Sequence, residues 1–330
     1  MTPDRPVQFG ILGAGRISCN AMAPALKAAA NAELVAVASR DPARAESLSP
    51  RRTYDEYLAL LDDAEVEAVY IGTHNGLHKS LTLAALERGK HVLCEKPLAC
   101  NAKEAAEMVD AAARHGRMLM EAFMYRYHPQ VAELVGRVRA GAIGTLKTVE
   151  ASFSFHHTDE QDVRYRADWG GGALLDLGCY CVNVCRLLFN GQPAAATAEG
   201  TFHPTCGVDL CVHGVLDFGD GRHGVISCGF DAGPRDHVYA VGTHGTLALT
   251  RAFASHRRST VLIERKNGDS TETAFPAANL FQLEVEDFAR AVRTGQPPLM
   301  PPDDGLLNAR VLDALLYGAR SGGTRFAVEA

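Results

Sequence analysis

The sequence predicts an α/β protein with an N-terminal Rossmann domain, built on a doubly wound sheet, and a C-terminal α/β domain with an open, largely antiparallel sheet. Three observations carry this prediction. A glycine-rich turn follows the first apolar strand, strands and helices then alternate to about residue 122, and strands dominate from about residue 145. We place the domain boundary after residue 124, which gives domains 1–124 and 125–330.

The composition indicates a globular protein without an evident macromolecular partner. The 330 residues include 33 Lys and Arg against 39 Asp and Glu, a net charge of −6, and the basic residues form no block. Nucleic acid and anionic membranes are therefore not expected partners. No apolar run is expected to span a membrane, and Met1–Arg5 contain no apolar signal core, so we expect a cytoplasmic protein.

Nine scattered cysteines offer one cluster that could be tested as a metal site, Cys179, Cys181 and Cys185. On a helix only Cys181 and Cys185 would share a face, and no third ligand is evident. We therefore predict no metal, and expect the cysteines to be small buried apolar residues.

The first strand, Val7 to Leu12, leads into the glycine-rich turn and an Ala-rich helix that extends to about Ala30. This strand–turn–helix order is the context in which glycines cradle a pyrophosphate at a helix N-terminus. The small Ser18 takes the third position, where close helix–strand packing is needed. The turn residues predicted to bind the cofactor are Gly13, Ala14, Gly15, Arg16 and Ile17.

The second strand, Glu33 to Ala38, ends in Ser39-Arg40. A site specific for NAD would place an acid at this strand tip, whereas a hydroxyl and a guanidinium suit a 2′-phosphate. The prediction is NADP. NAD stays possible, because Asp41 could reach back to the ribose.

The alternation continues with helices over 54–61, 77–88 and 102–115 and strands over 68–72, 91–94 and 118–122. The chain segments that leave these strands lie at the carboxyl edge of the sheet, where ligands bind. Further cofactor-binding candidates there are Thr73, His74, Asn75, His78, Glu95 and Lys96. For His78 a capping or packing role is the alternative.

Lys96 precedes Pro97, so its backbone is restricted to extended conformations and no helix can begin there directly. At the end of a strand, this arrangement would aim the lysine amine at a bound substrate. The alternative is an ordinary surface lysine in a turn.

In the second half, a helix is expected over 130–140, a strand over 145–155, several strands over 194–263 and two helices over 280–293 and 304–319. So few helices leave one sheet face uncovered, and a partner subunit is the simplest cover. We expect a homodimer or homotetramer.

A second group of polar residues follows Gly170-Gly171-Gly172. Asp176, Tyr180 and Asn183 fall at helical spacing on a segment that is otherwise apolar or small. These three residues would form a polar stripe on a buried helix, and buried polar groups need hydrogen-bond partners. The three glycines would let a ligand approach closely and provide them. The alternative is a structural hydrogen-bond network. Trp169 could pack on a nicotinamide or anchor its loop.

Together, Gly13-x-Gly15, Glu95-Lys96-Pro97 and the Gly-Gly-Gly-x3-Asp176-x3-Tyr180 pattern resemble the Gfo/Idh/MocA oxidoreductase family over nearly the whole chain. Many members have His at the place of Tyr180 and Asp at that of Asn183. The Tyr form, and the run from Glu121 to Pro129, resemble the branch of glucose–fructose oxidoreductase, dimeric dihydrodiol dehydrogenase and NADP-dependent D-xylose 1-dehydrogenase. The resemblance implies a Rossmann domain, an open-sheet domain, and pairing through that sheet.

We therefore expect an NADP-dependent oxidoreductase that transfers a hydride between nicotinamide and a sugar or related diol, of the aldose 1-dehydrogenase or trans-dihydrodiol dehydrogenase type. Tyr180 is the expected acid/base beside Lys96, with Asp176 orienting them; Lys96 as the proton carrier is the alternative. The substrate-contact candidates are Lys96, Arg126, His128, Arg166, Asp168, Asp176, Tyr180 and Asn183. The alternative functions are a biosynthetic sugar ketoreductase and a non-catalytic NADP-sensing regulator.

Overall fold

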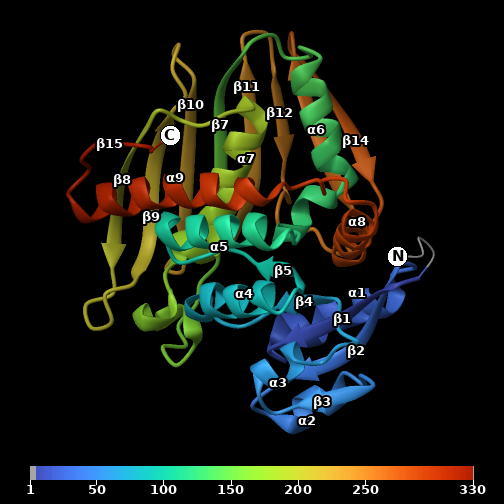
Figure 1. Cartoon of the computed structure of the whole chain (residues 1–330). Helices are drawn as coiled ribbons and strands as arrows, with labels where there is room; N and C mark the ends of the chain where they lie inside the picture. The colour runs from blue at the N-terminus through green and yellow to red at the C-terminus, as the bar shows by residue number, and fades with distance from the viewer. Residues whose placement is uncertain (1–4, 330) are drawn as a thin grey trace. The chain divides into compact units, whose positions relative to one another are not determined.

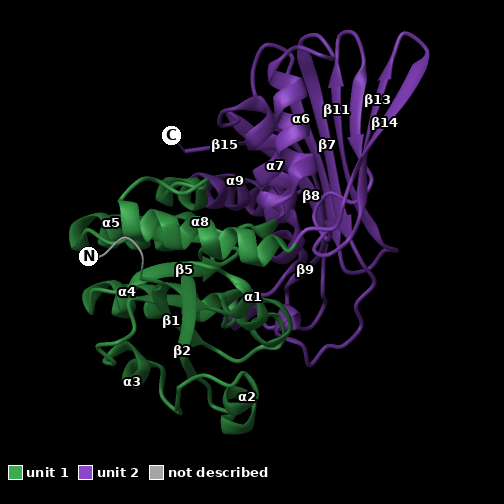
Figure 2. Cartoon of the chain, turned by 90° about the vertical axis from the view of Figure 1, so that its right-hand side faces the viewer, with its two compact units in different colours: residues 1–124, 279–306 green, residues 125–278, 307–330 purple. Residues whose placement is uncertain are grey.

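The computed structural model describes residues 5–329 and divides into two compact units (Figure 2). The first unit comprises residues 1–124 and 279–306, and the second comprises 125–278 and 307–330. The expected domain boundary after residue 124 coincides with one of the places where the chain passes between units. Residues 279–306 were expected in the second domain but lie in the first unit.

The first unit holds a parallel sheet of six strands in the order β3-β2-β1-β4-β5-β6. The strands are β1 (Val7–Leu12), β2 (Ala32–Ala38), β3 (Arg52–Tyr54), β4 (Ala68–Ile71), β5 (His91–Glu95) and β6 (Leu119–Ala122). The reversal of strand order between β1 and β4 puts the crossover helices on opposite faces. The prediction of a doubly wound Rossmann sheet is confirmed.

The helices of this unit are α1 (Ala23–Ala28), α2 (Pro42–Ser47), α3 (Tyr57–Leu61), α4 (His78–Glu87), α5 (Ala102–His115) and α8 (Leu280–Thr294). A π-helical turn, Ser18–Met22, precedes α1. The helix expected over 54–61 is shorter, because residues 52–54 pair with β2 as β3. Asp41 caps α2 by accepting the Arg44 amide at 3.3 Å, with Pro42 in the first helical turn.

Helix α8 joins the first unit through its apolar face. The rings of Phe288 and Phe9, on β1, are 6.0 Å apart, and both residues are fully buried. Arg293, in the last turn, donates to both Glu67 carboxylate oxygens at 2.9 and 2.6 Å. Pairing of this kind between segments 226 residues apart explains why a local sequence pattern does not place α8 in the first domain.

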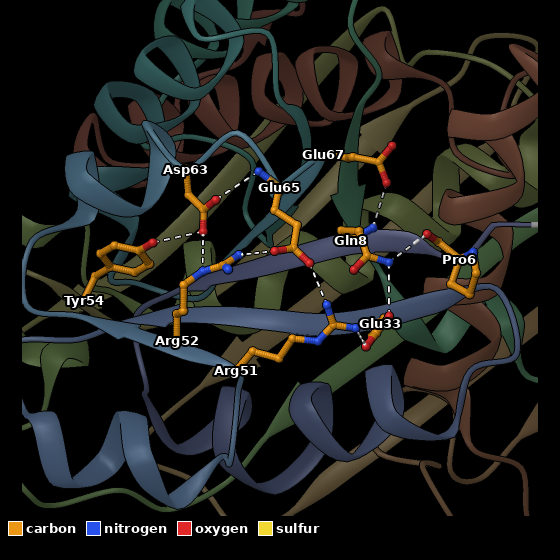
Figure 3. A network of polar contacts seen from close by, with 9 residues as sticks. All are labelled: Pro6, Gln8, Glu33, Arg51, Arg52, Tyr54, Asp63, Glu65 and Glu67. Carbon is orange, nitrogen blue, oxygen red and sulfur yellow. Dashed lines mark hydrogen bonds and ion pairs between the residues drawn. The ribbon is translucent and has the colours of Figure 1, made fainter. Parts of the chain in front are cut away.

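Figure 3 shows a network of charged residues around the start of β3. Arg52 donates to Asp63 at 2.8 Å and to Glu65 at 2.7 Å, and Arg51 pairs with Glu65 and Glu33. These residues lie at the amino ends of β2 and β3, or before β4, so the network is at the edge of the sheet opposite to the one where ligands bind in such folds. Its role is to hold the edge strands.

Glu284 on α8 is a fully buried carboxyl group, and neither oxygen has a hydrogen-bond partner among the described residues. Burial, and then repulsion from Glu95 and Asp287, raise its pKa well above the usual value of 4.5. Glu284 is therefore neutral in the folded protein at pH values where it is ionised in the unfolded chain. Folding takes up a proton at this side chain.

We expect Glu284→Gln to become increasingly stabilising as the pH rises. Because the folded state binds the extra proton, wild-type stability falls with pH above about 4.5, by up to about 1.4 kcal/mol per unit until the folded pKa is reached. Glutamine cannot ionise and removes this slope. Urea unfolding at pH 5.5 and 7.5 measures the difference, with Glu286→Gln on the same helix as the control. A difference between wild type and Glu284→Gln that does not change with pH would show that Glu284 is ionised in the folded state.

The second unit holds a mixed sheet of nine strands in the order β14-β13-β12-β11-β7-β10-β9-β8-β15 (Figure 1). Among its described strands only the β7–β10 pair is parallel, so the expected open, largely antiparallel sheet is confirmed. The strands are β7 (Leu146–Ser154), β8 (Ala195–Phe202), β9 (Asp209–Asp217), β10 (His223–Gly229), β11 (Arg235–Gly242), β12 (Thr246–Leu249), β13 (Thr260–Lys266), β14 (Asp269–Phe275) and β15 (Phe326–Ala327).

The helices that accompany this sheet are α6 (Pro129–Arg139), α7 (Cys179–Phe189) and α9 (Pro302–Arg320), of which α9 begins in the first unit. Helix α7 is continuous with a π-helical turn, Leu174–Gly178. The segment Ala167–Phe189 is long and apolar enough to cross a membrane by composition, which the sequence reading did not expect. In the structure 83% of its apolar window is buried, so it is a core helix of the second unit.

Candidate active site

The glycine-rich turn connects β1 to the π-helical turn at Ser18. Gly13 has φ +95°, which a side chain would strain, and a Cβ there would lie 3.0 Å from Thr73 Cγ2. The Ser18 hydroxyl donates to the Gly13 carbonyl at 2.7 Å and is fully buried. The turn therefore packs on the segment that leaves β4, while Arg16 and Ile17 stay exposed at the helix N-terminus. This arrangement fits a dinucleotide pyrophosphate.

The tip of β2 carries the residues predicted to choose between NADP and NAD. Ser39 is buried, and its hydroxyl oxygen accepts the Asp41 amide at 3.1 Å, while Arg40 is exposed. Asp41 is engaged with α2, because its carboxylate accepts the Arg44 amide at 3.3 Å and pairs with the Arg44 guanidinium at 3.3 Å. With Asp41 directed to this helix, the strand tip offers a hydroxyl and an exposed guanidinium rather than a carboxylate.

Lys96 follows β5 directly, at the carboxyl edge of the parallel sheet, and is partly exposed. The Lys96–Pro97 peptide bond is cis. The preceding Glu95 is buried, and its carboxylate accepts the Tyr70 hydroxyl from β4 at 2.6 Å. Burial, and then the Glu95 charge, raise the pKa of Tyr70 well above its usual value. At the end of β5, Lys96 is therefore partly exposed, whereas the side chain of Glu95 before it is buried.

His78 is completely buried at the start of α4. Its Nδ1 is 2.9 Å from the Pro97 carbonyl oxygen and its Nε2 is 3.2 Å from the Thr73 carbonyl oxygen. Burial lowers its pKa to about 4, so the ring is neutral. His78 therefore ties the segment after β4 to the one after β5, and the structure favours this packing role over direct cofactor contact. Thr73, His74 and Asn75 are partly exposed beside it.

Asp176 lies in the π-helical turn that leads into α7 and accepts a hydrogen bond from Arg164 Nε at 2.7 Å. Arg164 also donates to Asp162 at 3.1 Å. Burial opposes the charge of Arg164, but the two carboxylates outweigh it and raise the pKa of the guanidinium. Asp176 is therefore held as a paired carboxylate. Sequence reasoning missed Arg164, because a loop arginine twelve residues away has no local pattern that links it to Asp176.

Tyr180, one turn further, is 7% exposed. Its ring is surrounded by those of Phe153, Phe253 and Tyr125, with centroids 5.4, 5.5 and 5.7 Å away. These rings come from β7, from the segment after β12 and from the segment before α6. The aromatic surroundings fix the ring plane and shield it from water, which is what a positioned acid/base group requires.

Asn183 is fully buried, and its side-chain oxygen accepts the Tyr125 hydroxyl at 2.6 Å and Arg126 Nη1 at 3.3 Å. The structure thus brings together two predicted residues, Asn183 and Arg126, and adds Tyr125. Tyr125 lies in the run of residues that carried the family resemblance, so its position, though not its partner, was visible in the sequence.

His128 was a substrate-contact candidate, but it is fully buried and caps α6. Its Nδ1 accepts the Gln130 amide at 3.2 Å, and burial lowers its pKa. A residue that precedes Pro129 at a helix start is typical of an N-cap, and this signal could have identified the role.

Arg166, Asp168 and Trp169 form a local group on the loop before α7. Arg166 donates to Asp168 at 3.0 and 3.2 Å and lies 4.4 Å from the centre of the Trp169 ring. Arg166 and Asp168 are exposed and Trp169 is half-buried. The group orders its own loop, and Arg166 and Asp168 remain predicted substrate contacts.

Among residues 5–329, no group of three or more His, Cys, Asp or Glu side chains could hold a metal ion. The nine cysteines are free thiols, and Cys179, Cys181 and Cys185 are buried. Burial raises the pKa of the Cys185 thiol well above its usual value, as expected of an inert core residue.

Comparison with known protein families gives two matches that cover most of the chain. Residues 7–123 match the model described as the oxidoreductase family with an NAD-binding Rossmann fold, and residues 131–248 match the GFO/IDH/MocA C-terminal domain. The first match covers all six strands of the first sheet, and the second covers the strands of the second sheet from β7 into β12.

Individual relatives agree with these matches. The chain is 37% identical to D-xylose 1-dehydrogenase (NADP(+)) 2 of Haloferax volcanii, over 96% of this chain and 98% of the relative. It is 30% identical to trans-1,2-dihydrobenzene-1,2-diol dehydrogenase of Xenopus tropicalis, over 94% and 97%. Among solved structures, the 3-ketoreductase KijD10 of Actinomadura kijaniata, in complex with NADP and TDP-benzene, superposes with a TM-score of 0.90 at 30% identity, over 95% and 98% of the chains.

Proposed function

Because the chain belongs to the Gfo/Idh/MocA oxidoreductase family, we propose that it is an NADP-dependent oxidoreductase that moves a hydride between nicotinamide and a carbon of a sugar or related diol. The observation that carries the proposal is that each unit has polar residues suited to this chemistry. Lys96 is partly exposed directly after β5 in the dinucleotide-binding unit, and Asp176, Tyr180 and Asn183 follow one another along a buried helix of the other unit. The relatives named for xylose, dihydrodiol and sugar-nucleotide chemistry support this substrate class.

The bound nicotinamide supplies the hydride acceptor, and this chain's residues must manage the proton. When a substrate C–H bond loses its hydride, the hydroxyl on the same carbon must lose its proton to a base within hydrogen-bond reach. We assign that base to Tyr180, whose ring is held by Phe153, Phe253 and Tyr125. The Lys96 ammonium binds the substrate oxygen and stabilises its developing negative charge. Asp176, paired with Arg164, orients the groups around it.

The substrate class is tested by incubating the protein with NADP⁺ and a panel of aldoses and trans-diols and following NADPH absorbance. Turnover with aldoses or diols, and none with simple monohydric alcohols, is the expected result. A site that hydrogen-bonds a substrate hydroxyl discriminates strongly against substrates that lack it. Absence of turnover with every polyol, in both directions of the reaction, would contradict the proposal.

A sugar ketoreductase is the second candidate, because the superposition with a 3-ketoreductase is close. The chemistry is the same in reverse: the hydride goes to a carbonyl carbon, and Tyr180 donates the proton. A regulator that only senses the cofactor is not favoured, since the relatives described above are named for catalysed reactions.

We expect NADP to bind about ten- to a hundredfold more tightly than NAD. This is the usual contribution of one partly exposed, charge-assisted contact, here between Arg40 and the 2′-phosphate. Ser39→Asp should remove most of this preference by repulsion and should gain some NAD binding by offering the ribose an acceptor. Fluorescence titration with NADPH and NADH measures both changes. Arg88→Ala, which removes a cation paired with Asp62 instead, is the control. Equal affinity of the wild type for both cofactors would show that Arg40 is only a solvated charge.

We propose further that the protein is a homodimer or homotetramer, joined through the sheet face that α7 leaves uncovered. Val215 and Val225 face each other across β9 and β10 on that side and are 42% and 40% exposed. Replacing both by glutamate should dissociate the assembly, because it places like charges in a buried interface. Light scattering at micromolar concentration provides the measurement, and a monomeric wild type would exclude the assembly.

We also propose a cytoplasmic location. The support is that the nine cysteines are scattered along a long chain, without the dense cysteine pattern of small secreted domains.

A further inference from the structure

The helix that carries Asp176 and Tyr180 has an unusual start. Ala173 and Leu174, at its first positions, are fully buried, and Gly170, Gly171 and Gly172 precede them. The first amides of a helix have no hydrogen-bond acceptor within the helix. A preceding side chain often caps them, but glycine has no side chain that could do so. When buried, such amides must be satisfied from elsewhere in the chain.

Asp209, at the start of β9, satisfies one of them. Its Oδ2 accepts the Leu174 amide at 2.6 Å. Asp209 is 4% exposed, and 35 residues separate it from Leu174. A carboxylate at a helix N-terminus also interacts favourably with the helix dipole.

The glycine run makes room for this contact. Gly172 has φ +122°, and a Cβ there would overlap the Asp209 carboxylate. A Cβ on Gly171 would overlap the Arg164 carbonyl, and the Gly172 amide donates to that carbonyl at 3.0 Å. The sequence reading assigned the three glycines to close approach of a ligand. At Gly171 and Gly172 the chain's own atoms take up that space.

The contacts continue from this start to the reacting groups. The Asp176 amide donates to the Gly172 carbonyl at 3.1 Å, and Arg164, which lies at the other end of the same loop, holds the Asp176 carboxylate. Tyr180 follows one helical turn later. We propose that Asp209 is a positioning residue for catalysis: by binding the Leu174 amide at the start of this helix from β9, it fixes the positions of Asp176 and Tyr180. This inference rests on the proposed function of Tyr180.

The test uses the full-length protein with NADP⁺ and its best polyol substrate. Asp209→Ala should lower kcat by about 10- to 100-fold, the cost of misplacing catalytic groups by a fraction of an ångström to about 1 Å. The Kd of NADPH should stay within about twofold, because the glycine-rich turn and the tip of β2, where the pyrophosphate and the 2′-phosphate are expected to bind, are in the other unit. Asp209→Asn keeps the shape and one acceptor oxygen and should recover part of the loss. If the Asp209→Ala variant does not fold, Asp209→Asn alone provides the kcat measurement.

A double-mutant cycle separates positioning from stability. In the Tyr180→Phe background, Asp209→Asn should have little further effect on kcat, because the group that it positions is gone. Asp63→Ala is the control: Asp63 accepts the Glu65 amide at 2.9 Å in the charged network of the first unit, so its loss should cost stability and leave kcat unchanged in both backgrounds.

Two results would overturn the inference. A kcat within twofold of wild type for both Asp209 variants would do so. An equal loss of kcat on Asp209→Asn in the wild-type and Tyr180→Phe backgrounds would also do so, because it would mean a structural role alone. Failure of the proposed function looks different: Tyr180→Phe itself would turn over at the wild-type rate, and there would be no group for Asp209 to position.

Discussion

Replacing Lys96 by methionine is expected to lower kcat by about 10²–10⁴-fold, the usual contribution of one positioned catalytic group. Methionine keeps much of the length and apolar stem of the side chain and removes the ammonium that would bind the substrate oxygen. Affinity for NADPH should change little, because Lys96 follows β5 while the expected pyrophosphate site follows β1.

Stopped-flow and steady-state measurements with NADP⁺ give kcat, and fluorescence titration gives the cofactor Kd. Lys79→Met is the matched control, since Lys79 on α4 pairs with Glu107 at 3.0 Å and takes no part in the proposed chemistry. A Lys96→Met variant that kept more than about a tenth of the wild-type kcat, outside the range for a catalytic group, would remove Lys96 from the mechanism.

Tyr180→Phe should also lower kcat steeply, and it should change the dependence of kcat on pH. The substitution deletes one hydroxyl and leaves the ring among Phe153, Phe253 and Tyr125, so packing is preserved. If Tyr180 accepts the substrate proton, the oxidation rate of the wild type rises with pH as the phenol ionises, and the variant loses that limb of the profile.

The pH profile also decides between the two proton carriers. A steep loss of kcat with an unchanged profile would assign proton transfer to Lys96 and leave Tyr180 as a hydrogen-bond donor. Tyr239→Phe provides the control: Tyr239 lies on β11 beside His237, with ring centroids 5.1 Å apart, in the same unit but outside the proposed chemistry. Its profile should match the wild type.

Local signals explain where the sequence predicted the fold well. The bounds of α5 were predicted correctly because Asn101 caps its start, accepting the Glu104 amide at 2.9 Å, and Gly116 ends it with φ +60°. By contrast, β3 was missed because it is three residues long and is defined only by its pairing with β2. Helix α8 was found as a helix, but its place in the first unit depends on Phe9, at the far end of the chain.

In the candidate site, too, features that depend on local sequence were predictable and long-range partners were not. The helical spacing of Asp176, Tyr180 and Asn183 was visible, because it depends only on the period of a helix. The partners of this stripe were not visible, since Arg164 and Tyr125 come from loops and Asp209 from a strand. His78 and His128 are buried and hydrogen-bonded to the backbone, which for His78 agrees with the packing role given as its alternative in the sequence analysis.

The return of residues 279–306 to the first unit has a consequence for synthesis on the ribosome. Residues 125–278 are translated before α8, which supplies Phe288 and Arg293 to the first sheet. At about 5–20 residues per second, this intervening segment delays its arrival by roughly 8–30 s. During that interval the nascent Rossmann sheet has one face without its final helix. The first unit therefore cannot be completed until residues 125–278 of the second unit have been synthesised.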